Sequence, residues 1–115
     1  YDRRVASDMF AKSMAEKIHW STRETPGKTG IGTIGKNPEE NNRSGFSALP
    51  GGYRDLQGDF LGNNFCGIWW SSYEIDEVRG HAQELHYNYG GMHWRPDSKR
   101  RAFSVRLLRD VSYTE

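Results

Sequence analysis

Apolar positions along the chain follow a helical period at its start and a strand period at its end. Ala6, Phe10, Met14 and Ile18 are spaced by four residues, which places them on one face of a helix. The pattern predicts one amphipathic helix over residues 1–18. Prolines and glycines then crowd residues 21–44, and such a density of backbone breakers predicts a loop.

The clearest strand patterns lie in the second half of the chain. Residues 66–72 read CGIWWSS, an apolar run typical of a buried strand. Apolar and polar residues alternate on both sides of Gly90-Gly91, which predicts a β-hairpin with a two-residue turn. Four pairs face each other in this register: Tyr89 with Met92, Tyr87 with Trp94, Asn88 with His93, and His86 with Arg95. A turn at residues 96–98 and a third strand carrying Phe103, Val105 and Leu107 complete an antiparallel meander.

Composition sets limits on the class of protein. The chain of 115 residues is long enough for one core, so residues 1–115 are expected to form a single domain. Its 16 basic and 15 acidic residues nearly cancel, which argues against a nucleic-acid-binding role. The sequence contains no apolar run of the length that a membrane-inserted helix needs. The single cysteine, Cys66, excludes an intrachain disulfide.

Recognition-type side chains gather in residues 73–101, where rigid rings alternate with hydrogen-bonding groups. The candidate ligand-binding residues are Tyr87, Tyr89, Trp94, His86, Asn88, His93 and Arg95. Strand alternation turns the rings and the polar groups toward opposite faces, so one of the two sets is expected to be structural. The alternative is a solvated hairpin face that binds nothing. Trp69 and Trp70 are expected in the core, and at most one of them lines an open site.

Metal and catalytic signals are weak. Asp55, Asp59, Asn63 and Asn64 lie in a glycine-rich loop and are weak candidates for calcium, but such residues more often bond their own backbone. His86, His93 and Glu84 are a weaker transition-metal candidate, because spacing fixes no third strong ligand. No other cofactor is expected. The sequence contains no catalytic motif that we recognise, and Cys66 resembles a small buried apolar residue, so we expect no enzyme.

Three blocks of sequence resemble a known family. These are GFSALPGGYRD at residues 45–55, GIWWSS at 67–72 and FSVRLLRD at 103–110. In order and spacing they are similar to the signatures of the Fibrobacter succinogenes major paralogous domain, and AKSMAEKIHW at residues 11–20 is similar to the segment before them. Two positions depart from the family. Tyr73 stands where the family has threonine, and Leu107-Leu108 stands where it has a small residue or cysteine.

This resemblance implies an α+β fold of the C-type-lectin-like kind, with an N-terminal helix, long irregular glycine-rich loops and a C-terminal antiparallel β meander. It also implies a bacterial cell-surface or secreted protein, often a lipoprotein, without established catalytic activity. The family's N-terminal part is not found before Tyr1. The chain is therefore expected to be the C-terminal portion of a larger family domain, with an open sheet edge that a second copy or another chain meets.

These observations predict a non-enzymatic, surface-exposed or secreted bacterial domain that recognises a carbohydrate or protein ligand through its C-terminal hairpin region. In retroelement variable proteins, which share the fold that the resemblance implies, ligand contacts come from the corresponding region. Two alternatives stay open. One is a structural or adhesive module of a larger surface protein with no small ligand, and the other is a degenerate enzyme-like domain.

Overall fold

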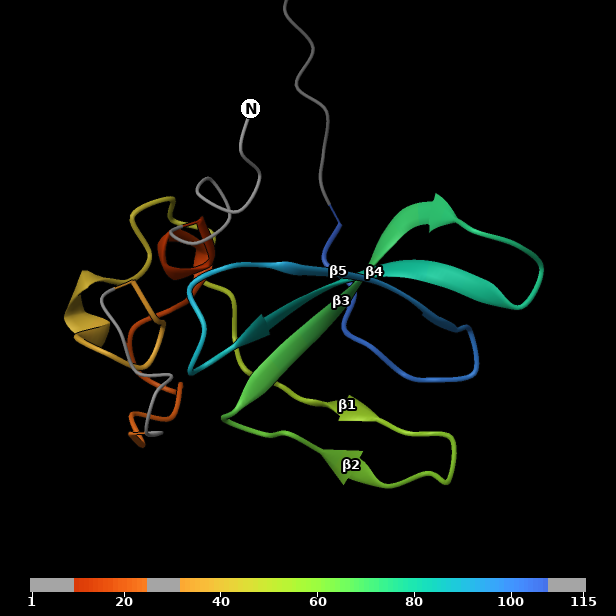
Figure 1. The fold of residues 1–115 in the computed structure, drawn as a ribbon, viewed down its shortest axis with the longest axis horizontal. Helices are drawn as coiled ribbons and strands as arrows, with labels where there is room; N and C mark the ends of the chain where they lie inside the picture. The colour runs from red at the N-terminus through yellow and green to blue at the C-terminus, as the bar shows by residue number, and fades with distance from the viewer. Residues whose placement is uncertain (1–9, 25–31, 108–115) are drawn as a thin grey trace, which may run out of the picture.

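The fold is mostly β, and a computed structural model describes it for residues 10–24 and 32–107 (Figure 1). A short helix covers residues 10–14, and the other elements follow it in the chain. They are the 3-10 helix η1 (Pro38–Glu40) and the strands β1 (Tyr53–Arg54), β2 (Phe60–Leu61), β3 (Cys66–Glu74), β4 (Arg79–His86) and β5 (His93–Ser98). β3, β4 and β5 form an antiparallel sheet in that order, and β1 pairs with β2. No helix in the described part of the chain is long and apolar enough to cross a membrane.

The predicted strand at residues 66–72 is confirmed by β3, and its alternation gives the sheet two different faces. Trp69 is opposite Gln83, and Trp70 is opposite Ala82. Because paired residues of an antiparallel sheet point the same way, each tryptophan defines a face of the whole sheet. We call these the Trp69 face and the Trp70 face.

Each face covers its own apolar cluster. On the Trp69 face, Leu85 packs with buried residues of the N-terminal segments, and Trp69, Tyr87 and Met92 pack against them. On the Trp70 face, Ile68, Ala82 and Phe103 are buried together, flanked by Tyr53 and Trp70. The N-terminal layer lies at one end of the sheet, as Figure 1 shows.

The outer edge of β3 pairs with two loop segments. Gly52 forms a parallel bridge with Gly67, and Ser104 forms another with Trp69. The predicted third strand with Phe103, Val105 and Leu107 is wrong. Only isolated bridges form in this segment, and the side chain of Leu107 is 89 % exposed. The predicted turn at residues 96–98 is also wrong, since these residues belong to β5. No described segment pairs with the outer edge of β5, and pairing of that edge with another chain stays a prediction.

The hairpin prediction is confirmed for its two strands but wrong in register. β4 ends at His86 and β5 begins at His93, so the connection is a loop over residues 87–92 and not a two-residue turn. The Tyr87 carbonyl accepts from the Gly35 N–H at 2.6 Å, and the Gly90 carbonyl accepts from the Ala11 N–H at 3.2 Å. The N-terminal layer takes up this backbone, and the register is shifted by four residues, so that Gln83 instead of Tyr87 is opposite Trp94.

The predicted helix over residues 1–18 is wrong at its C-terminal end, and its first nine residues lie outside the described part. After residue 14 the chain becomes extended, and Ala15 bridges to Ala48. The Glu16 carboxylate accepts from the N–H groups of Ile18 and His19. These bonds close a non-helical turn where the prediction had a further turn of helix. Ile18 is consequently 81 % exposed. The loop prediction for residues 21–44 is confirmed in the described part, apart from the short η1.

The ammonium group of Lys12 holds the loop against the helix. Its Nζ donates to the Thr33 carbonyl at 3.0 Å, the Asn37 carbonyl at 3.2 Å and the Asn41 Oδ1 at 2.9 Å, and it also contacts the Lys36 carbonyl. Partial burial lowers the pKa of Lys12, and the nearby carboxylates of Glu40 and Glu39 oppose that shift. One side chain thus satisfies several loop acceptors that form no regular ladder.

The substitution Lys12→Met should lower the free energy of unfolding by roughly 2–3 kcal/mol, because it leaves these acceptors without their donor in a partly buried place. Urea unfolding followed by tryptophan fluorescence measures the change. Lys17→Met is the matched control, since Lys17 is exposed on the adjacent turn. Equal midpoints for the two variants would contradict this role of Lys12.

Candidate functional site

The Trp69 face carries a groove of about 610 Å³ beside the N-terminal layer. This volume lies in the range of sites that hold small molecules, about 300–1,000 Å³. The described residues that line it come from the sheet, the helix and three irregular segments: Met14, Phe46, Trp69, Trp70, Ser71, Ser72, Gln83, Leu85, Met92, Val105, Arg106 and Leu107. This lining is mainly apolar, with a few hydroxyl and amide groups and one charged group.

A row of three side chains crosses the sheet at this place. Gln83 of β4 is opposite Trp69 of β3 on one side and Trp94 of β5 on the other. With strands about 4.8 Å apart, the backbones that carry the two tryptophans are about 10 Å from each other. Within the described residues the Gln83 amide forms no hydrogen bond. The row thus offers two rings and one free amide on one face.

Local sequence fixes the rings of this row. The Trp69 ring lies over Gly67, where a Cβ atom would be 2.4 Å from the Trp69 Cη2. Trp94 stacks on His81 with ring centroids 4.6 Å apart and planes at 19°, and Tyr73 meets His81 edge-on. Trp94 is 58 % exposed. Its stacking partner holds the ring in place, so a ligand would meet a preorganised aromatic surface.

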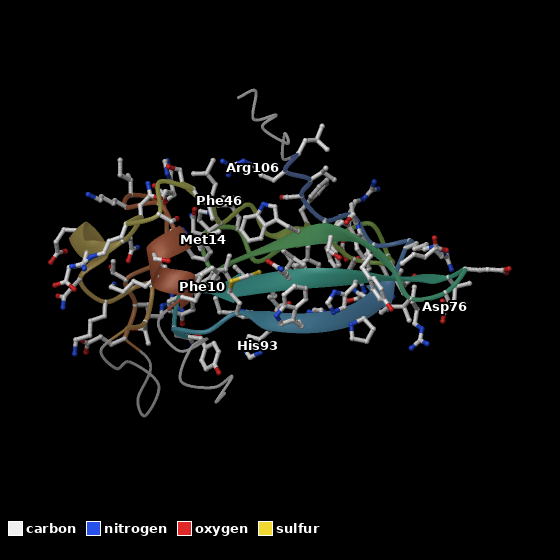
Figure 2. The ribbon with its side chains drawn as sticks, turned by 90° about the horizontal axis from the view of Figure 1, so that it is seen from above. Phe10, Met14, Phe46, Asp76, His93 and Arg106 are labelled. Carbon is white, nitrogen blue, oxygen red and sulfur yellow. The ribbon has the colours of Figure 1, made fainter. Side chains whose placement is uncertain are left out.

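Arg106 and Phe46 form a further part of the groove wall (Figure 2). The Arg106 guanidinium lies 4.1 Å from the Phe46 ring centroid, and its Nη2 donates to the Phe46 carbonyl at 2.7 Å. These two contacts hold the side chain against the wall. Sequence reasoning did not single out Phe46, Gln83 or Arg106 as site residues.

The Trp70 face carries a chain of charged groups over β4 and β5. The Glu84 carboxylate contacts both His86 and Arg95, and Arg95 also contacts Asp97. Asp97 in turn accepts from Arg101 at 2.7 Å. Burial alone would raise the pKa of Glu84, but the hydrogen bonds and charges of His86 and Arg95 outweigh it and lower this pKa to about 2. Glu84 is therefore ionised at neutral pH.

Four of the seven predicted ligand-binding residues gather on the Trp70 face, where His86 and His93 meet edge-on with ring centroids 5.7 Å apart, and the other three lie elsewhere. Trp94 points to the Trp69 face, as the alternation predicted, and His86, His93 and Arg95 belong to the Trp70 face. Tyr89 departs from the prediction, because it stacks on His93 with ring centroids 4.5 Å apart instead of joining Trp94. The other two lie in the hairpin loop, where Tyr87 packs edge-on against Phe65 and Asn88 is half-buried.

The calcium candidate Asp55 is already hydrogen-bonded within its own loop. Asp55 Oδ1 accepts from the N–H groups of Gln57 and Asp59, both at 2.9 Å, so this carboxylate closes its own turn. Asn63 and Asn64 lie in the turn before β3, where Asn64 has a φ of 71°. In the described part of the chain, no three His, Cys, Asp or Glu residues are grouped as a metal ion would require.

Comparison with known proteins gives no relative for this chain. No family model, no curated protein and no solved structure matches it. The resemblance to the Fibrobacter succinogenes major paralogous domain therefore stays a prediction.

Cys66 is a buried thiol directly opposite His86 in the sheet. Burial raises its pKa to about 11, with a further contribution from the Glu84 charge and an opposing one from Arg95. At neutral pH the thiolate fraction should be on the order of a hundredfold smaller than in the unfolded chain. Alkylation of the native protein should accordingly be slower by at least that factor than in urea. Equal rates in the two conditions would contradict this environment.

Glu84→Gln tests the charge chain. Because the pKa of Glu84 is lower in the folded than in the unfolded chain, its ionisation stabilises the fold above pH 4.5, and this contribution is lost as the pH falls toward about 2. The variant should lose about 2 kcal/mol of unfolding free energy at pH 7 and show a flatter stability curve between these pH values. Chemical unfolding at several pH values measures both effects, with the exposed Glu77→Gln as control. A variant whose curve parallels the parent's would disprove the assignment.

Proposed function

We propose that this domain is a non-enzymatic carbohydrate-binding module, and that its ligand lies on the Trp69 face across the row of Trp69, Gln83 and Trp94. The observation that carries this proposal is the row itself, in which Trp69 and Gln83 line the groove and Trp94 follows them on the next strand. Aromatic rings bury the apolar faces of pyranose rings, and an amide both donates to and accepts from sugar hydroxyls.

The arrangement of the titratable groups supports a binding role over catalysis. The Cys66 thiol is buried and its pKa is raised, which is the opposite of what a nucleophile needs. The pKa of the Glu84 carboxyl group is lowered to about 2, because its two neighbours stabilise the ionised form. A general acid or base needs a pKa nearer the working pH.

We also propose that the domain is a C-type-lectin-like module of a secreted or surface-exposed bacterial protein, as the sequence resemblance implies. The three resembling blocks are neighbours in space, which supports this assignment. Gly52 of the first block bridges to Gly67 of the second, and Ser104 of the third bridges to Trp69. The blocks thus form one structural unit around β3.

A glycan array followed by titration of the hits tests the binding proposal. Trp94→Ala and Gln83→Ala should each weaken binding by about tenfold or more, because each removes a central contact of the row. Phe60→Ala is the matched control for loss of an exposed ring, since Phe60 is 82 % exposed on the other hairpin.

A His93→Ala variant distinguishes the two faces. If His93→Ala abolishes binding and Trp94→Ala does not, the ligand lies on the Trp70 face and the proposed site is wrong. A blank array with folded protein would reject carbohydrate recognition and favour a protein ligand or a purely adhesive role.

A further inference from the structure

Among the described residues, one charged side chain lines the groove, and no described residue neutralises it. Arg106 is the only ionisable residue in the described lining of the groove. It forms no ion pair with any described residue, whereas Arg79, Arg95 and Arg101 all do. The groove therefore has a single positive charge above an apolar and amide-bearing floor.

Two contacts keep this charge in position without cancelling it. The Phe46 ring and carbonyl hold one side of the guanidinium, and neither carries a negative charge. A guanidinium has five N–H donors in a planar fork, and Nη2 is the one guanidinium atom that donates to a described residue. The remaining donors are free for a planar anion such as a carboxylate, which arginine binds in a bidentate manner.

We propose that the ligand of the groove is an acidic oligosaccharide, with a hexuronate unit whose carboxylate pairs with Arg106 while its ring packs over Trp69 and Gln83, which line the groove together with Arg106. This inference rests on the proposed carbohydrate-binding function and specifies its ligand class. Charge complementarity is what selects the class. A neutral sugar would leave the one charge of the groove unpaired, and a basic ligand would be repelled by it.

The test compares uronate oligosaccharides with their methyl esters, which keep the ring and lose the charge. Oligomers of galacturonate, glucuronate, mannuronate and guluronate are titrated against the parent protein, and the free acids should bind at least tenfold more tightly than the esters. Added salt should reduce this difference, because it screens the ion pair. Arg106→Gln should remove the preference, and Arg106→Lys should retain part of it, since lysine keeps the charge without the fork.

Two controls accompany these titrations. Arg43→Gln removes one charge from an exposed position that does not line the groove, and it should leave binding unchanged. Thermal unfolding of each variant shows that the fold is intact.

If neutral glycans bind and the acids show no advantage, the acidic ligand class is wrong while carbohydrate binding stands. If the acids bind equally to Arg106→Gln, Arg106 is not the anion contact. If no glycan binds at all, both proposals fail.

Discussion

The structure depends on one constraint, the alternation of two adjacent tryptophans along β3. Trp69 and Trp70 must point to opposite faces, and each then packs against a different apolar cluster. Glycines give the rings room, because Trp69 lies over Gly67 and Trp70 lies close to Gly80. A slip of one residue in this strand would exchange the two faces. The hydrogen bonds of β4 on one edge, and of Gly52 and Ser104 on the other, hold the register against such a slip.

Sequence patterns predicted the parts of the fold that depend on neighbouring residues. The strand at residues 66–72 follows from an apolar run, and the two strands of the hairpin and the division of side chains between faces follow from a period of two. The hairpin register does not, because it depends on contacts of Tyr87 with Gly35 and of Gly90 with Ala11, which are distant in sequence. The error was four residues, an even number, so Trp94 still faces the predicted side. The helix end at Ala15 depends likewise on a distant bridge to Ala48.

The site was harder to predict than the fold for the same reason. The alternation predicted that at most one of the two tryptophans lines an open site, and this is wrong, because Trp69 and Trp70 both line the groove. Arg106 and Phe46 are 60 residues apart, and no local pattern brings them to one wall. Two of the polar residues that looked like ligand readers, His86 and Arg95, instead bind Glu84. Composition pointed to a region, but only the register shows which of its groups are already paired.

The two faces of the sheet therefore differ in whether their polar groups already have partners among the described residues. On the Trp70 face, the desolvated carboxylate of Glu84 is held by Arg95 and His86, and removing Arg95 would leave a buried charge without compensation. Those groups are committed to the fold. On the Trp69 face, the Gln83 amide and the Arg106 guanidinium keep free donors within the described residues. A binding surface needs such unpaired groups beside rigid rings, and this is the physical reason to place the ligand on the Trp69 face.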